Sequence, residues 1–285
     1  MLGHRLCRVW NKTYEVWATY RKAADCYQQY QMLDCNHQLG GIEVGNISRI
    51  ASIIKKLSPN VVINAIGMVK QRPEGKKRHT AIMINALFPH YLADLCENFS
   101  SRMIHISTDC VFSGRKGQYV ETDIPDPVDD YGMCKVLGEV LRPNVLTLRT
   151  SMIGWELENR IGLMEWFAAQ RGKTIQGYRN AIFSGFTTQA MAALLGELIT
   201  KQPGLNGLYH LSSEPISKFQ LLEMCQSRLG WFDIDLQPQD QFVIDRSLNG
   251  KRLNDMMEWH LPNWQTMLDD LCRDWCWYAR YRQVN

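Results

Sequence analysis

The sequence predicts an α/β fold in which helices cover both faces of a doubly wound, mainly parallel sheet. Strand-like and helix-like segments alternate through the first half of the chain, as in stacked βα units. The run Val61-Val62-Ile63-Asn64-Ala65 is nearly continuous in apolar residues, which is typical of a strand buried on both faces. Small and polar residues follow several of these strands directly, at the edge where such sheets bind ligands.

Each element of the first half has its own signal. Residues 48–57 place isoleucine and leucine at helical spacing behind Asn46, a good N-terminal cap. The next expected helix, 82–97, tolerates Pro89 only near its first turn. The remaining expected elements are strands at 15–19, 42–44, 61–65, 103–107 and 145–149 and a helix at 130–141.

In the second half the alternation loosens, although helices are still expected at 163–170, 188–200 and 217–229. An apolar stripe over 264–275 predicts one more helix that packs on the core. These residues therefore predict a smaller domain that packs on the first.

Composition narrows the class of partner. The net charge of +3 over 285 residues gives no reason to expect a nucleic acid or an acidic membrane surface. The nine cysteines are scattered without a C-x-x-C pair, which favours a reducing cytoplasm and offers no metal site. No apolar run approaches the ~20 residues that a membrane span needs. We expect a cytoplasmic protein that binds a small molecule, with no nucleic acid, no membrane and no metal.

Tyr131 and Lys135 form a Y-x-x-x-K pattern on the helix expected at 130–141. Residues four apart share one face of a helix, so the ammonium is expected to lower the pKa of the phenol and prepare it for proton transfer. Taken alone, the pair is also typical of a solvated helix face.

Two further groups follow strands. Ser107 and Thr108 end the strand at 103–107, where a hydroxyl could polarise the carbonyl that Tyr131 protonates, or could simply cap the turn. Asn64, Ala65 and Gly67 end the strand before it, where small residues would let a cofactor approach the backbone.

The order of NAIG, ISTDCVFSG, YGMCK and LRTSMIG along the chain resembles the extended short-chain dehydrogenase/reductases, especially the dTDP-4-dehydrorhamnose reductase branch. The resemblance implies a Rossmann-like fold, with a dinucleotide-binding domain over 1–150, a return to it at about 183–211, and a mainly substrate-binding subdomain over 151–285. It implies that Thr108, Tyr131 and Lys135 are catalytic and that Lys135 also holds the nicotinamide ribose. It further implies that Asn64, Ala65, Gly67, Asn85 and Ser107 line the cofactor, and that Ser184 and Arg246 lie near the sugar nucleotide.

The resemblance also bears on the start of the chain. Met1-Leu2-Gly3 matches the end of the family pattern G-x-x-G-x-x-G, which makes Gly3 the glycine that packs the first helix on the first strand. We expect that strand, and the two preceding glycines, to lie upstream of Met1 or to have been lost. Tyr20 and Arg21 stand where the adenosine ribose is expected. Because a guanidinium suits the extra phosphate of NADP, we expect NADPH, with NADH as the alternative.

The leading hypothesis is NADPH-dependent reduction of a nucleotide-linked 4-keto-6-deoxy sugar for surface polysaccharide synthesis. An epimerase or dehydratase of the same superfamily is the second hypothesis, although Cys110 stands where a dehydratase would carry an acid. The third is a regulatory, non-catalytic or truncated family member. A homodimer is compatible with all three.

Overall fold

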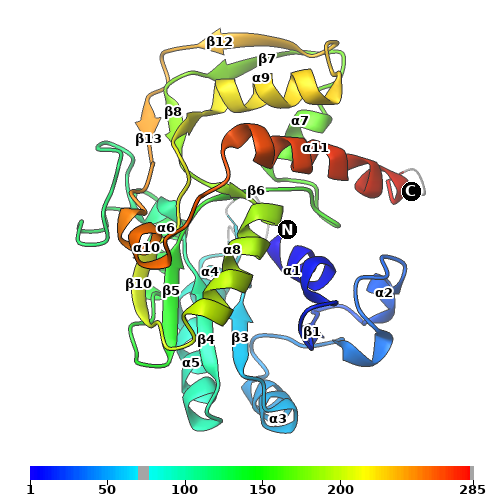
Figure 1. Ribbon diagram of the computed structural model, residues 1–285, viewed down its shortest axis with the longest axis vertical. Coiled ribbons are helices and arrows are strands. Elements are labelled where there is room, and N and C mark those ends of the chain that lie inside the picture. Colours follow the sequence, from blue (N-terminus) through cyan, green and yellow to red (C-terminus); the bar gives the residue numbers. More distant parts are fainter. Residues whose placement is uncertain (70–76, 283–285) are drawn as a thin grey trace.

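The computed structural model describes residues 1–69 and 77–282. At its centre is a four-stranded parallel sheet in the order β10-β5-β4-β3 (Figure 1). Its strands are β3 (Val61–Asn64), β4 (Arg102–Ile106), β5 (Val145–Arg149) and β10 (Gly207–His210). The expected strands at 61–65, 103–107 and 145–149 are thereby confirmed to within one residue, and β10 lies within the expected return to the first domain.

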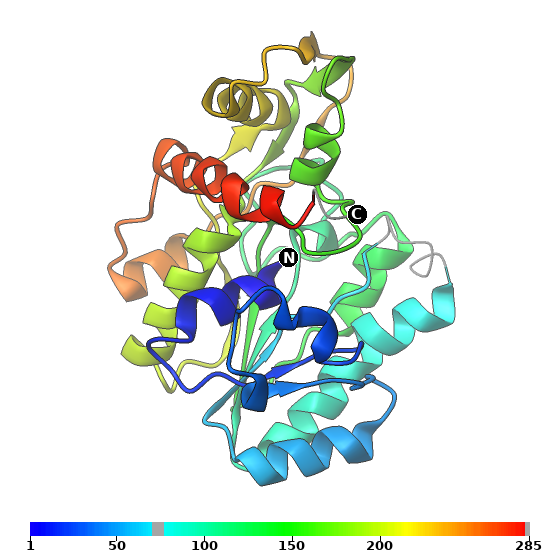
Figure 2. The same ribbon diagram turned by 90° about the vertical axis from the view of Figure 1, so that its right-hand side faces the viewer.

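Helices cover both faces of this sheet (Figure 2). One face packs on α1 (Leu2–Trp10) and α8 (Thr188–Lys201), through Ile104, Ile106, Leu146 and Leu148. The opposite face packs on α3 (Ile47–Leu57) and α5 (Phe88–Asn98), through Met103 and Val145. Because side chains alternate along a strand, neighbouring residues of β4 and β5 serve the two faces, and the α/β sandwich expected from the sequence is confirmed.

A separate two-stranded sheet holds β1 (Ala18–Thr19) beside β2 (Gln38–Leu39). The expected strand at 15–19 is thus reduced to two residues, and the strand expected at 42–44 is wrong. Gly40 and Gly41 turn the chain after Leu39, and a Cβ on Gly40 would overlap the backbone at Ala24. The apolar residues at 42–44 therefore follow the turn and do not extend the strand.

No described strand joins β1 to β3, so β3 is the edge of the larger sheet. Val61, Val62 and Ile63 are consequently only partly buried, whereas the sequence predicted burial on both faces.

The helices follow the sequence closely. Asn46 caps α3 by accepting a hydrogen bond from the Arg49 amide at 3.1 Å. The helix expected over 82–97 is divided into a π-helical segment, Ile82–Leu87, and α5, in whose first turn Pro89 lies as required. It is preceded by α4 (Arg78–Ala81), and α6 (Asp130–Leu137) ends four residues before its expected limit.

The second half forms a smaller lobe above the sheet (Figure 1). Its parallel pair β7–β12 lies beside α9, and its β8 lies between β11 and β13. Its elements are β7 (Thr174–Tyr178), β8 (Ala181–Phe183), β11 (Ile216–Ser217), β12 (Asp235–Gln239), β13 (Ile244–Asp245), α7 (Leu163–Ala168) and α9 (Lys218–Leu229). The helix α10 (Lys251–Met257) lies beside β10 of the larger sheet. The short strands β6 (Met152–Ile153) and β9 (Phe186–Thr187) pair with each other, and α2 (Asp25–Gln28) follows β1.

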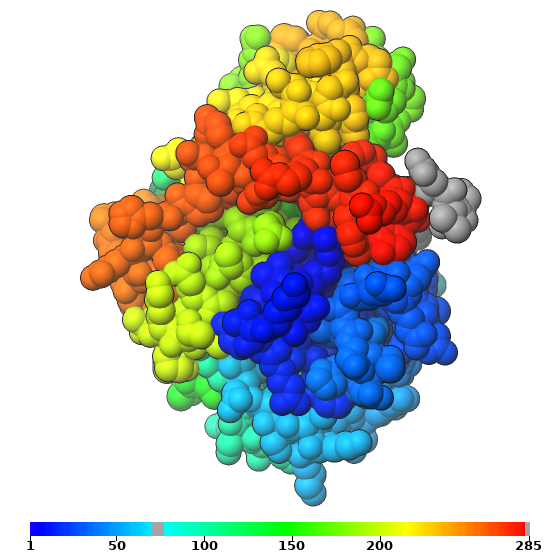
Figure 3. All heavy atoms as spheres, turned by 45° about the vertical axis from the view of Figure 1, so that its right-hand side comes forward, coloured from blue at the N-terminus to red at the C-terminus, as the bar shows by residue number. Residues whose placement is uncertain are grey.

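The last helix, α11 (Trp264–Arg280), lies between the smaller lobe and α1 (Figure 3). Its apolar stripe packs into the main core, as the sequence predicted. Within the described residues, no helix combines the length and the apolar character needed to cross a lipid bilayer.

Candidate active site

The site forms where β4 ends and α6 begins. Asp129 caps α6 by accepting a hydrogen bond from the Gly132 amide at 2.8 Å. Gly132 lets the helix approach the turn after β4 closely, because a Cβ there would overlap the carbonyl oxygen of Cys110. The glycine inside the Y-x-x-x-K motif thus sets the distance between the helix and the turn that carries Thr108.

Thr108 and Tyr131 meet across this contact. The Thr108 hydroxyl is buried, donates to Asp109 Oδ1 at 3.1 Å and accepts from the Cys110 amide at 3.2 Å. It also shares a hydrogen bond with the phenol of Tyr131. The hydroxyl therefore caps the turn and also lies beside the phenol, while its action on a substrate carbonyl stays a prediction.

Lys135 lies one turn farther along α6, and its ammonium is buried. Its Nζ donates to the carbonyl oxygen of Ile106 at 2.8 Å. Burial lowers the pKa of Lys135 to about 8, against a smaller opposing effect of the Glu139 carboxylate. The ammonium is thus still largely protonated at neutral pH, and it is fixed beside the last residue of β4.

Tyr131 behaves differently from the expectation. Burial raises the pKa of its phenol, and the nearby Cys110, Asp109 and Asp129 raise it further, outweighing the hydrogen bond with Thr108. The prediction that Lys135 lowers this pKa is wrong for this structure, because the ammonium is directed at the Ile106 carbonyl. A phenol that stays protonated at neutral pH is, however, the form that donates a proton.

A buried ion pair between Arg149 and Glu139 lies next to Ser107, at the end of β4. Arg149, the last residue of β5, donates through Nε and Nη2 to the two oxygens of Glu139, each at 2.8 Å. Ser107 donates to the same carboxylate at 2.8 Å. The sequence suggested that the Ser107 hydroxyl is free to meet a ligand. In the structure it is hydrogen-bonded to Glu139.

The turn after β3 is shaped by Asn64 and Asn85. The buried Asn64 amide lies 3.1 Å from His105 Nδ1, and its oxygen accepts from the Ile66 amide. Asn85, from the π-helical segment, pairs with both backbone groups of Met68 at 2.8 Å. These two hydrogen bonds hold the turn in place, and Ala65 and Gly67 remain exposed at the surface. Such a turn, with Ala65 and Gly67 exposed on either side of Ile66, fits the close approach of a cofactor to the backbone.

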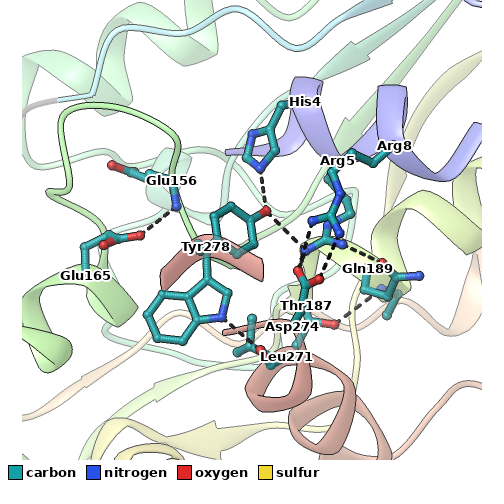
Figure 4. Close-up of polar contacts among 12 residues, drawn as sticks. His4, Arg5, Arg8, Glu156, Glu165, Thr187, Gln189, Leu271, Asp274 and Tyr278 are labelled. Atoms are coloured by element: carbon teal, nitrogen blue, oxygen red, sulfur yellow. Dashed lines mark hydrogen bonds and ion pairs between the residues drawn. The ribbon is translucent and has the colours of Figure 1, made fainter. Parts of the chain in front are cut away.

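The first turn of α1 is held by α11 (Figure 4). His4 Nε2 lies 2.6 Å from the hydroxyl of Tyr278, and Arg5 contacts both Tyr278 and Asp274. Arg8 adds a second ion pair to Asp274 at 3.1 Å. These side chains are used within the protein, so they orient α1 and are not free to meet a ligand.

Gly3 has no close neighbour, since a Cβ built on it meets no atom within 4 Å. The strand on which Gly3 was expected to pack is not among the described residues, so this expectation stays a prediction.

The expected adenosine site lies at the end of β1. Tyr20 stacks on Tyr27 with ring centres 4.3 Å apart. Arg21 is exposed, while its neighbour Lys22 pairs with Glu158 at 2.7 Å. An exposed guanidinium beside a stacked aromatic pair fits the phosphorylated ribose of NADP.

The two residues expected near the substrate differ in availability. Ser184 is buried, and its hydroxyl exchanges hydrogen bonds with the backbone of Leu248, so it joins two loops of the smaller lobe. Arg246 is partly exposed and reaches the catalytic turn: its Nε donates to the Phe112 carbonyl at 3.0 Å, and Nη1 lies 3.5 Å from Cys110 Sγ.

Lys218, which the sequence did not single out, also lies near this turn, within reach of the charges of Asp109 and Cys110. No local pattern marks it, because it is simply the first residue of a predicted helix. Across residues 1–69 and 77–282, no three or more histidines, cysteines or acidic residues gather as a metal site would require.

The sequence matches the protein family described as the RmlD substrate binding domain over residues 1–274. It is 29% identical to a dTDP-4-dehydrorhamnose reductase of Aggregatibacter actinomycetemcomitans over 216 residues, which make up 73% of this chain and 69% of that protein. A hypothetical dTDP-4-dehydrorhamnose reductase from Sulfolobus tokodaii superimposes with a TM-score of 0.75 and 25% identity, over 91% of this chain and 92% of its own. The dTDP-4-dehydrorhamnose reductase from Bacillus anthracis str. Ames, solved in complex with NADP, has a TM-score of 0.74 and 20% identity, over 91% of this chain and 100% of its own.

Proposed function

Because the chain belongs to the RmlD substrate binding domain family, we propose that it reduces the keto group of a nucleotide-linked 4-keto-6-deoxy sugar with NADPH. The observation that carries the proposal is the contact between Thr108 and a protonated Tyr131, with the Lys135 ammonium one helical turn away. The reductase from Aggregatibacter adds support from the sequence.

The chemistry follows from the protonation states. NADPH supplies the hydride that adds to the ketone carbon. Tyr131 transfers its phenolic proton to the ketone oxygen, and the Thr108 hydroxyl hydrogen-bonds to the same oxygen as charge develops there. Lys135, whose Nζ is fixed at the Ile106 carbonyl, would hold the nicotinamide ribose. Burial raises the pKa of Tyr131, so the phenol is protonated at neutral pH and carries the proton that the ketone oxygen needs.

Residues that fit the cofactor lie along the ends of three strands. Asn64, Ala65 and Gly67 would face its middle, and Tyr20 and Arg21 its adenosine end. Residues 1–150, with the return at 183–211, would form the cofactor-binding domain, and most of 151–285 would bind the substrate. Arg21 favours NADPH over NADH, because NADH lacks the 2′-phosphate on the adenosine ribose that a guanidinium would pair with.

The epimerase and dehydratase alternatives use the same Tyr131 and Lys135 but return the hydride to the sugar. Cys110 follows the Thr108-Asp109 pair and carries no carboxyl group, which disfavours the dehydratase. The fold alone does not separate these enzymes, so the net consumption of NADPH is the deciding measurement.

We also propose a homodimer in the cytoplasm. Met83, Leu87 and Tyr91 form an exposed apolar stripe, which continues through Leu137 at the end of α6 and Leu141 beyond it. Two copies related by a two-fold axis would cover these stripes with each other, since an isologous interface is self-complementary. Leu137→Lys should convert a dimer into a monomer in light scattering, and a wild-type monomer would contradict the interface. All nine cysteines are free thiols, which suits a reducing compartment.

The function is tested by incubating the chain with a panel of nucleotide-linked 4-keto sugars and NADPH. We expect one equivalent of NADPH to be oxidised for each ketone lost. Conversion of the sugar without net oxidation would support an epimerase. Neither binding nor oxidation of NADPH would support the non-catalytic family member.

A further inference from the structure

Lys218 begins α9 in the smaller lobe and points its ammonium at the catalytic turn. Its Nζ lies 3.4 Å from the centre of the Phe183 ring, a cation–π contact that fixes the side chain. Its ammonium lies within electrostatic range of the Asp109 carboxylate and the Cys110 side chain, across the boundary between the lobes. Among the described residues, no carboxylate lies within ion-pair distance of it and no hydrogen bond is made to it.

A second cation approaches the same turn. Arg246, at the end of β13, reaches Cys110 Sγ from the smaller lobe while its Nε is held by the Phe112 carbonyl. Lys218 and Arg246 therefore flank Cys110, whose own charge is felt by Tyr131. Of the two cations, Arg246 is bonded to the protein, whereas Lys218 is held only by an aromatic ring.

Three contacts follow one another along the segment after β4. Lys135 Nζ bonds to the Ile106 carbonyl, Tyr131 interacts with Thr108, and Arg246 Nη1 reaches Cys110 Sγ. Thr108 and Tyr131 already provide two donors for the ketone oxygen, so a further cation is not needed there. Lys218 and Arg246 come from the smaller lobe, which is expected to bind the substrate, so they suit its charged part.

We propose that the Lys218 ammonium binds a phosphate group of the substrate's nucleoside diphosphate, assisted by Arg246. The proposal rests on the proposed function, because it assumes a nucleotide-linked sugar. A partly buried cation without a carboxylate is unfavourable in the free protein, and a phosphate oxygen would relieve that cost through a charge-assisted hydrogen bond. Burial lowers the pKa of Lys218 to about 8, so the anion site is charged at neutral pH and loses its charge in mild alkali.

The test measures equilibrium binding of UDP and dTDP by calorimetry, with the full chain and with NADP+ present. Lys218→Met removes the ammonium and keeps the length of the side chain. We expect its affinity for a nucleoside diphosphate to fall by about 10- to 150-fold, the loss of one charge-assisted hydrogen bond. Binding of uridine and thymidine, which lack phosphate, should not change.

Two variants control the comparison. Lys218→Arg keeps the charge and should retain most of the affinity. Lys251→Met replaces an exposed lysine at the start of α10 that pairs with Asp255. This variant should bind nucleoside diphosphates like the wild type. In the wild type, diphosphate affinity should also fall as the pH rises through about 8, and in Lys218→Arg this fall should be absent. This pH series tests the proposal even if Lys218→Met does not fold.

The outcomes separate the two proposals. Wild-type affinity in a folded Lys218→Met would overturn the role of Lys218 and leave the reductase standing. Equal losses for nucleosides and diphosphates would indicate structural damage and would also overturn it. Diphosphate binding that is retained, with a raised KM for the whole nucleotide sugar, would place the ammonium at a sugar substituent and reject the phosphate. A wild type that binds neither UDP nor dTDP would overturn the proposed function itself.

Discussion

Replacing Glu139 with glutamine should destabilise the protein more than any change of a surface charge. The side chains of Glu139 and Arg149 are 8% and 3% exposed, and Arg149 donates two hydrogen bonds of 2.8 Å to the carboxylate. In Glu139→Gln the guanidinium keeps its charge but loses its counter-charge, and one of its N–H groups faces an amide N–H. Breaking a buried pair on one side costs about 3–5 kcal/mol.

That loss is large against a typical free energy of unfolding of about 5–15 kcal/mol. Equilibrium unfolding in urea measures it, with Asp255→Asn as the matched control. Asp255 pairs with Lys251 at the surface, where the two side chains are 62% and 76% exposed, so the control should lose less than about 1 kcal/mol.

A double variant tests the cause. Glu139→Leu combined with Arg149→Met removes both charges, and replacing a buried pair with apolar residues is often neutral or stabilising. It should therefore recover most of the stability that Glu139→Gln loses. The reasoning is refuted if Glu139→Gln is no less stable than Asp255→Asn, or if the double variant is as unstable as the single one.

Four further predictions concern the catalytic residues and the cofactor. Tyr131→Phe should lower kcat about 10²- to 10⁴-fold with little change in unfolding, because Thr108 keeps its bonds to the neighbouring turn; an unchanged rate of NADPH oxidation would remove Tyr131 from the mechanism. NADPH affinity should fall as the pH rises through about 8, where Lys135 loses its proton, and a titration of Lys135→Met that shows the same fall would contradict this. In the folded protein Lys135 loses its proton at a pH of about 8, whereas in the unfolded chain it keeps the proton up to its ordinary pKa of 10.5. The contribution of Lys135 to the free energy of unfolding should therefore rise between pH 8 and pH 10.5. Arg21→Ala should weaken NADPH without affecting NADH, as initial rates with the two cofactors would reveal.

The catalytic turn was predictable because its signals are local. Strand periodicity placed Thr108 at the end of β4, and helical spacing placed Tyr131 and Lys135 on one helix. The contact between the turn and α6 was not predictable, since it depends on Gly132 meeting the Cys110 carbonyl, a contact that no spacing in the sequence encodes.

The misjudged features arise from tertiary structure. The pKa of Tyr131 follows from burial and from the direction of the Lys135 ammonium, whereas i, i+4 spacing gives only their approximate distance. The residues at 42–44 have the composition of a strand, but the glycine turn before them sets where pairing stops. Lys218 comes to the site only because the smaller lobe folds back over β4, so no nearby residue signals its role.

The contacts between α1 and α11 also bear on how the protein is made. During synthesis, Arg5 emerges from the ribosome long before Asp274 and Tyr278. Its guanidinium therefore lacks the Asp274 carboxylate until almost the whole chain has been made. These ion pairs are then among the last contacts to form, because contacts so distant along the chain form slowly. The apolar side of α1 packs on α8, which is made earlier, so this packing can hold the first helix in place before α11 completes its polar contacts.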